Sequence, residues 1–248
     1  MCDQPVSTPY GCALARRRLL KASAAAPALW ALGGSLLSDV AFAAALTHAQ
    51  RDAMTPDQII AMMKRGNQRF RRGEKEPRDL LAQQRASAKG QYPAAVILSC
   101  IDSRAPAERI MDLGIGDIFN ARVAGNIAND DILGSLEFAC KLSGAKVVVV
   151  MGHTACGAIK GAIDNAELGN LTGLLAKIKP AVAATKYEGD RSAKNYTFVD
   201  AVAKTNVEMT LAEIRARSSV LRELEKAGTI KMVGAMYDLK TAVVQFYA

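Results

Sequence analysis

The sequence predicts an α/β fold: a mostly parallel central β-sheet, about four parallel strands plus an antiparallel strand at its C-terminal edge, flanked by helices. Two observations carry this prediction. Short apolar runs alternate with longer amphipathic segments over most of the chain, and half of the 248 residues are hydrophobic, which allows a large core. Strands separated by helices pair in parallel through right-handed crossovers, so one domain is expected over residues 50–248.

The expected strands are short aliphatic runs that suit burial on both faces of a sheet. They cover residues 94–99, 117–123, 146–151, 230–237 and 242–247, and the last pairs back on its predecessor as a hairpin. A helix is expected to start at Pro56, with Thr55 as its N-cap. Further helical segments are expected over residues 79–89, 106–111, 131–142, 158–165, 171–186 and 199–226.

Residues 1–43 have the pattern of a bacterial export signal. Arg16-Arg17 precedes an Ala/Leu-rich run, and Ala41-Phe42-Ala43 is a small-residue cleavage site. The arginine pair resembles a twin-arginine signal, and this predicts a periplasmic or secreted protein. A membrane anchor and an internal helix are the alternatives. No other long apolar segment follows, so no stable membrane anchor is expected after cleavage.

Charge and cysteine usage narrow the function classes. The formal net charge is +8, but no basic block alternates with aromatic residues, so nucleic acid is not an expected partner. The five cysteines form no disulfide framework. Cys140 is expected to be a buried helix thiol, and His48 an exposed residue in a terminal tail.

Three residues form a candidate metal site. Cys100 ends the first expected strand, His153 ends the third, and Cys156 opens the helix that follows it. The carboxyl ends of parallel strands lie at one edge of a sheet, where ligands gather. Two thiolates and an imidazole suit Zn²⁺, and three protein ligands leave a fourth position for water. The alternative is a pair of buried thiols and a hydrogen-bonded core histidine.

Two charged residues follow the first candidate ligand. Asp102 and Arg104 are two positions apart, so the guanidinium is able to hold the carboxylate in its ionised form beside a metal. The alternative is an ordinary surface ion pair. Gly152 and Gly157 flank the second motif and allow close backbone approach.

These residues belong to two motifs, Cys100-Ile101-Asp102-Ser103-Arg104 and Gly152-His153-Thr154-Ala155-Cys156-Gly157. Other landmarks along residues 55–248 are Gly66-Asn67-Gln68-Arg69-Phe70, Gly116-Asp117-Ile118-Phe119, Ala124-Gly125-Asn126, Asn206-Val207 and Gly234-Ala235-Met236-Tyr237-Asp238. In these motifs the chain resembles the β-class carbonic anhydrases.

The resemblance implies reversible hydration of carbon dioxide to bicarbonate and a proton, by attack of zinc-bound hydroxide. It implies one Zn²⁺ per subunit and a homodimer or dimer-based tetramer. It gives Cys100, His153 and Cys156 as zinc ligands and Asp102 and Arg104 as the catalytic dyad. The implied substrate-binding residues are Gln91, expected to act across the dimer interface, the apolar wall residues Phe119 and Phe138, and Gly157. The alternatives are a solvated loop residue for Gln91 and ordinary core packing for Phe119 and Phe138.

The chain also departs from the family pattern. Val123 stands where many members have Asn. Members in which the aspartate replaces the zinc-bound water carry Trp and Val where this chain has Ile97 and Ala105, so an open, water-bound zinc is expected.

Other functions stay open at the level of sequence. Hydrolysis of carbonyl sulfide or carbon disulfide on the same scaffold is one alternative, and a non-catalytic zinc- or bicarbonate-binding protein is another. A dinucleotide-binding site is not expected, because Gly114-x-Gly116 precedes a strand rather than a helix.

Overall fold

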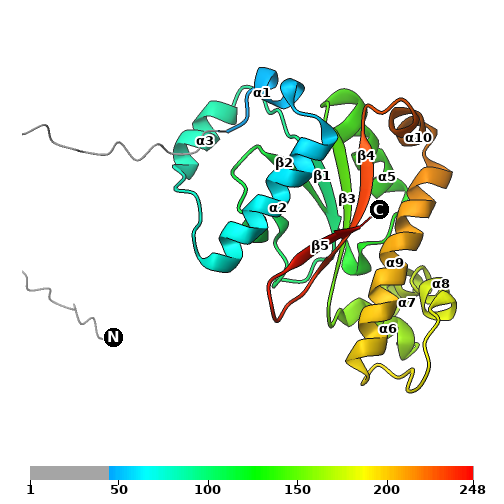
Figure 1. The fold of residues 1–248 in the computed structure, drawn as a ribbon. Helices are drawn as coiled ribbons and strands as arrows, with labels where there is room; N and C mark the ends of the chain where they lie inside the picture. The colour runs from blue at the N-terminus through cyan, green and yellow to red at the C-terminus, as the bar shows by residue number, and fades with distance from the viewer. Residues whose placement is uncertain (1–44, 248) are drawn as a thin grey trace, which may run out of the picture. The chain divides into compact units, whose positions relative to one another are not determined.

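The computed structural model describes residues 45–247, and the export signal expected in residues 1–43 lies outside them. The described chain forms a five-stranded sheet with helices on both faces (Figure 1). The strands are β1 (Ala95–Ser99), β2 (Ile118–Arg122), β3 (Val147–His153), β4 (Lys231–Tyr237) and β5 (Val244–Tyr247). Their order is β2-β1-β3-β4-β5, with β5 antiparallel to β4 and the other pairs parallel. The predicted fold class is confirmed, including the C-terminal hairpin.

The register of the two central strands determines where the candidate ligands emerge. β1 and β3 pair in parallel from Ala95 opposite Val147 to Ser99 opposite Met151. Every residue of both strands is buried, as expected for aliphatic strands covered on both faces. β1 ends at Ser99, while β3 continues to His153. The chain therefore leaves both strands at the same edge of the sheet.

One face of the sheet is covered by α2 (Pro56–Arg72), with α4 (Ala107–Ile110) beside it. Thr55 caps α2 in a capping box with Gln58, and Pro56 occupies its first turn, as predicted. Ile59 and Met63 of α2 pack on the inward side chains of β1, β3 and β4. α3 (Leu80–Ser87) precedes β1.

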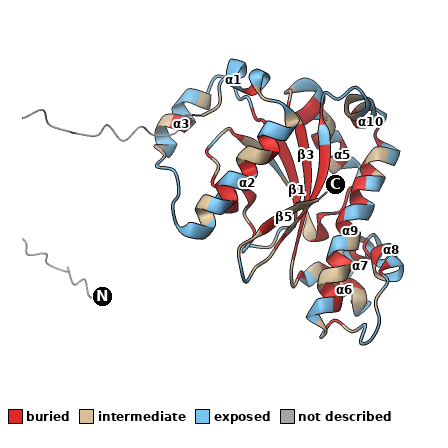
Figure 2. Ribbon diagram, in the orientation of Figure 1, coloured by how far each residue is buried: buried red, intermediate tan, exposed pale blue. Residues whose placement is uncertain are grey.

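The opposite face is covered by α5 (Asp130–Glu137), the π-type turn η2 (Phe138–Leu142), α9 (Tyr196–Arg217) and α10 (Ser219–Lys226). Figure 2 shows the buried residues of these helices turned toward the sheet. Val207 and Leu211 of α9 pack on the side chains of β1 and β3 that point away from α2. Among residues 45–247 no helix, α9 included, is long and apolar enough to cross a membrane.

A third hydrophobic cluster surrounds the carboxyl ends of β1 and β3. It is built by α6 (Gly157–Ile163), α7 (Gly169–Ala176), α8 (Lys179–Ala184), the 3₁₀ turn η1 (Ala124–Asn126) and the first half of α9. Cys100 and Cys156 belong to this cluster and are buried in it with Ile178 and Phe198. The candidate ligands thus lie in a packed environment rather than on an open loop.

Three local predictions were wrong. The segment 171–186 forms two helices, because Pro180 lies in the first turn of α8 and cannot continue a preceding helix. The segment 199–226 breaks at Ser218, whose extended backbone and side-chain cap start α10. His48 is exposed, but it lies in α1 (His48–Ala53) and pairs with Asp52 at 3.2 Å, instead of lying in a tail.

Asn67 connects α2 to two other parts of the fold. Its buried side chain donates to the carbonyl oxygens of Ile110 and Ala242, both at 2.9 Å, and accepts from the amide of Val244 at 3.0 Å. The last two bonds fix the start of β5. Loss of this side chain leaves three backbone groups without their partner.

We expect Asn67→Ala to lower the free energy of unfolding by about 2–4 kcal/mol, because buried polar groups left unpaired cost about 1–3 kcal/mol each. Urea unfolding at a fixed zinc concentration measures this. Gln68→Ala changes an exposed neighbour on the same helix and serves as the control, with an expected change within about 0.5 kcal/mol. An equal effect of the two substitutions would show that the Asn67 bonds contribute nothing.

Candidate metal centre

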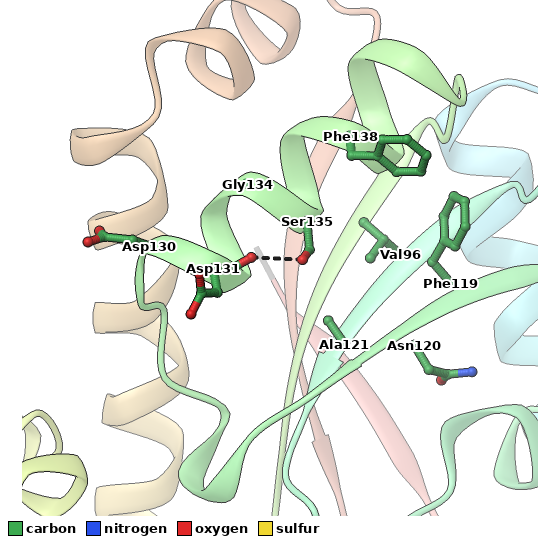
Figure 3. A pocket seen from close by; sticks show the side chains of 9 residues that line it. All are labelled: Val96, Phe119, Asn120, Ala121, Asp130, Asp131, Gly134, Ser135 and Phe138. Carbon is green, nitrogen blue, oxygen red and sulfur yellow. Dashed lines mark hydrogen bonds between the residues drawn. The ribbon is translucent and has the colours of Figure 1, made fainter.

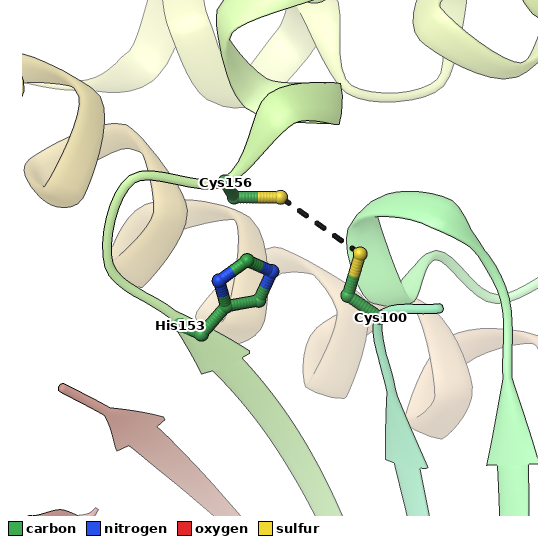
Figure 4. A group of neighbouring side chains, drawn as sticks. All are labelled: Cys100, His153 and Cys156. Carbon is green, nitrogen blue, oxygen red and sulfur yellow. Dashed lines mark hydrogen bonds between the residues drawn. The ribbon is translucent and has the colours of Figure 1, made fainter. Parts of the chain in front are cut away.

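The side chains of Cys100, His153 and Cys156 converge at the carboxyl edge of the sheet (Figure 4). Their ligand atoms all lie within 4.8 Å of one another, and the two sulfur atoms are 4.0 Å apart. Two zinc–sulfur bonds of about 2.3 Å at a tetrahedral angle place the sulfurs about 3.8 Å apart. All three residues are at most 5% exposed. The donor set and its spacing fit Zn²⁺.

A sharp turn after β3 brings Cys156 back toward Cys100. Ala155 adopts a left-handed backbone conformation with φ of 53°, and Cys156 then precedes the first residue of α6. Gly152 is required by packing, since a Cβ there would lie 2.8 Å from both Met236 and Val207. Gly157 is exposed and a Cβ there would meet nothing, so packing does not demand glycine; its role at the substrate stays a prediction.

His153 presents one ring nitrogen to the cluster. Its Nδ1 lies 2.9 Å from the carbonyl oxygen of Thr154, which only accepts, so Nδ1 carries the proton. Nε2 is then an acceptor, and it is buried without a hydrogen-bond partner in the described chain. An unpaired buried acceptor is costly unless a ligand satisfies it. A metal ion opposite the two sulfurs is such a ligand.

The ionisation of each thiol depends on the other. Hydrogen bonding from Cys156, assisted by the Gly125 amide 3.4 Å from the sulfur, lowers the pKa of Cys100. The same interaction with Cys100, together with burial, raises the pKa of Cys156. Because ionisation of one sulfur opposes ionisation of the other, a divalent cation is needed to make two thiolates favourable.

Asp102 and Arg104 form a dyad beside the cluster. Nε and Nη2 of Arg104 donate to the two carboxylate oxygens of Asp102, at 2.9 and 2.7 Å, and the Arg104 amide donates to Oδ1 at 2.9 Å. The Arg104 side chain lowers the pKa of Asp102 to about 2, against the effect of burial. Oδ2 of Asp102 lies 3.8 Å from Nε2 of His153. An ionised carboxylate is thus fixed next to the metal ligands.

Two residues that support this site were not identified as such from the sequence. Arg122 donates to the carbonyl oxygens of Cys100, at 2.8 and 3.0 Å, and of Asp102, at 2.6 Å. Asn206 of α9 donates at 2.8 Å to the carbonyl oxygen of Gly125, whose amide donates to the Cys100 sulfur. In the sequence Asn206 is only a landmark of a family pattern and Arg122 only part of an expected strand, because their bonds go to backbone atoms that no motif reveals.

Phe119 and Phe138 lie away from the metal ligands of their own chain. Phe119 pairs in register with Val96, and the four residues from there to Cys100 correspond to about 13 Å of strand. The two rings meet edge to face with centroids 6.2 Å apart, and Phe138 is 50% exposed. They line a pocket of about 580 Å³ together with residues of α5 (Figure 3). Their roles at the substrate stay predictions.

Gln91 also lies far from the metal ligands of its own chain. It is exposed in the loop before β1, whereas Cys100 follows the other end of that strand. It borders a small pocket with Leu46 and Tyr92. Within one chain the structure therefore brings together the three ligands and the dyad, but none of the three side chains expected to contact substrate.

Comparison with known proteins agrees with this geometry. The sequence model of a family described as carbonic anhydrase matches residues 95–244, more than half of the chain. The chain belongs to the carbonic anhydrase family. The ligand cluster, the dyad and all five strands lie within or at the ends of the matched segment.

Two curated relatives in this family are mycobacterial proteins. The chain is 35% identical over 183 residues to carbonic anhydrase 2 of Mycobacterium tuberculosis, covering 71% of this chain and 86% of that protein. It is 31% identical over 189 residues to a carbonic anhydrase of Mycolicibacterium smegmatis, covering 74% and 89%.

Solved structures place the chain in the β class of carbonic anhydrases. The β-carbonic anhydrase CafA of Aspergillus fumigatus superposes with a TM-score of 0.58 at 29% identity, covering 66% of this chain and 79% of that one. The β-carbonic anhydrase CcaA shares the fold, with a TM-score of 0.61 at 21% identity over 76% of this chain and 87% of that one.

We expect Cys156→Ser to lower zinc affinity by roughly 100-fold or more, because loss of a ligand exceeds the 10–100-fold cost of losing an outer partner. Zinc per chain after dialysis, measured by mass spectrometry, tests this. Cys140→Ala is the matched control, since Cys140 is buried in the cluster under α5 and should not affect bound zinc. Full zinc retention by the Cys156 variant would rule out this donor set.

Proposed function

We propose that this protein catalyses the reversible hydration of carbon dioxide to bicarbonate and a proton, with one zinc ion per subunit held by Cys100, His153 and Cys156. The observation that carries the proposal is a buried Cys-His-Cys cluster with an ionised carboxylate fixed beside it, in a chain of the carbonic anhydrase family. Bound zinc supplies a Lewis acid that makes water a nucleophile near neutral pH.

Asp102 orients the reacting oxygen in this proposal. Its carboxylate stays ionised far below neutral pH, so it accepts a hydrogen bond from a water or hydroxide placed beside His153. Because Arg104 engages both carboxylate oxygens, the acceptor has a fixed direction. The same bonds turn Asp102 toward Arg104, which supports an open site in which Asp102 does not itself bind the metal.

We also propose that the active enzyme is a homodimer or a dimer-based tetramer. In the described chain β2 is an edge strand with a neighbour on one side only. Phe138, which contacts Phe119 of this strand, is 50% exposed and is available for a partner to cover. A solved neighbour from Sordaria macrospora is described as a tetrameric β-carbonic anhydrase. A partner placed on this edge gives Gln91, Phe119 and Phe138 a route to the other subunit's metal site.

We expect Asp102→Ala to keep its zinc and to lose about 10–100-fold in kcat/KM for carbon dioxide hydration, the usual cost of removing an outer partner of a metal site. Stopped-flow hydration assays on zinc-loaded protein measure this. Ser103→Ala is the control, because Ser103 is exposed in the same loop and makes no hydrogen bond in the described chain. Wild-type protein with one zinc per chain and no hydration would disprove the proposed reaction.

The same assays separate the alternative hydrolase. Carbon disulfide and carbonyl sulfide are offered to the zinc-loaded wild type beside carbon dioxide. Hydrolysis of either without hydration of carbon dioxide would assign the site to the alternative. No contact in the described part of the chain favours the sulfur substrates.

We propose export through the twin-arginine route, with cleavage near Ala43. The support is the Arg16-Arg17 pair and the small-residue site Ala41-Phe42-Ala43. A route that carries folded proteins suits an enzyme whose metal ligands are buried, since zinc is then bound before export.

We expect the double variant Arg16→Lys and Arg17→Lys to remain in the cytoplasm of a bacterium that has the pathway, at full precursor mass. Cell fractionation and intact-mass measurement show where the chain is and whether it is cleaved. Arg18→Lys is the control, with unchanged export. Periplasmic, processed double variant would refute this route.

A further inference from the structure

The turn between His153 and Cys156 is strained. Ala155 has φ of 53°, a left-handed conformation that residues with a Cβ seldom adopt. Such a conformation persists only where neighbouring groups hold it. The left-handed conformation of Ala155 turns the chain back, so that the Cys156 sulfur lies 4.0 Å from the Cys100 sulfur.

Two elements hold this turn. On its β4 side, the amide of Thr154 donates to the carbonyl oxygen of Tyr237 at 3.0 Å, and the Thr154 hydroxyl accepts from the amide of Leu239. On its α9 side, the amide of Ala155 donates to Oδ1 of Asp200 at 2.7 Å. The second bond is the one that reaches the strained residue itself.

Asp200 is well placed to act as a support. It lies in the first two turns of α9, after Phe198 and Val199, which are fully buried. Asn195 caps the helix, so the position of Asp200 is fixed by packing and by capping. No cation pairs with Asp200 within 4.0 Å in the part of the chain that the structure describes. The backbone amide of Ala155 is therefore its main partner.

We propose that Asp200 is a positioning residue of the metal centre, which holds the left-handed turn at Ala155 and thereby aims Cys156 at the zinc ion. The inference rests on the zinc site of the proposed function, and it adds a residue that lies outside both ligand motifs. Asp200 acts through the backbone and touches no ligand side chain.

The electrostatic environment of Asp200 agrees with this role. Burial raises the pKa of Asp200 and the nearby Asp238 carboxylate adds to the rise, while the hydrogen bond from Ala155 opposes it. The hydrogen bond of Asp200 stabilises one group, the Ala155 amide in the turn between His153 and Cys156.

The experiment measures zinc release from the intact, zinc-loaded protein into a chromogenic chelator. Asp200→Ala should release zinc about 10–100-fold faster, the usual effect of an outer partner of a metal site. Asp200→Asn keeps an acceptor oxygen and should release zinc at close to the wild-type rate. Asp200→Leu has a similar shape to Asn but no acceptor, and should behave like the alanine variant; it serves if that variant does not fold.

A second substitution isolates the turn. Glycine adopts positive φ without strain, so the effect of Asp200→Ala should be much smaller in an Ala155→Gly background. Glu208→Ala is the control, since this carboxylate is exposed on the same helix and pairs with no cation within 4.0 Å in the described chain, and zinc release should not change.

Wild-type zinc release from both Asp200→Ala and Asp200→Leu would overturn the inference. So would an equal effect of Asp200→Ala with and without the Ala155→Gly substitution, or an equal loss in Glu208→Ala. Zinc release needs no turnover of carbon dioxide. Absence of hydration by the wild type would therefore refute the proposed reaction, and the zinc-release rates would still decide the role of Asp200.

Discussion

The candidate metal centre depends on the parallel register of β1 and β3. Ser99, the last residue of β1, lies opposite Met151, and β3 continues for two more residues to His153. Cys100 and His153 therefore lie at the same, carboxyl end of the two strands. Side chains alternate between the faces of a sheet, so a shift of one residue would turn His153 away from Cys100. The fully buried aliphatic side chains of both strands make such a shift costly, because they fill two different layers of the core.

Helix α9 transfers the rigidity of the core to both halves of the site. Val207 packs on β3 beneath the site, at a distance that Gly152 permits. From the same helix, Asn206 reaches the loop whose Gly125 amide contacts the Cys100 sulfur, and Asp200 reaches Ala155. Three ligands from two loops can meet one ion within tenths of an ångström only if both loops have a common support. A long helix packed on the central strands provides it.

Features that show as a pattern of hydrophobic residues, or as chemically distinctive residue types, could be predicted from the sequence. Aliphatic runs predicted all five strands, and residue type with strand-end position predicted the three residues that meet. Ser218 and Pro180 broke two expected helices through backbone properties that periodicity does not record. Arg122 and Asp200 could not be found as supports, because each acts on a backbone atom far away in sequence. The distance of Phe119 from the ligands of its own chain follows from strand register, which one strand's sequence does not contain.

Two carboxylates flank the ligands, and their surroundings separate their roles. Arg104 holds Asp102 and lowers its pKa to about 2, whereas burial raises the pKa of Asp200, which has only an amide as its close partner in the described chain. Groups whose environments push their pKa values apart usually have different tasks. In the proposed reaction, the Asp102 carboxylate keeps its charge beside His153, so it suits direct contact with the reacting oxygen. The Asp200 carboxylate accepts its hydrogen bond from the backbone that carries Cys156, so it contributes to the geometry of the site. The candidate metal ligands are buried, whereas Arg104 is exposed to solvent.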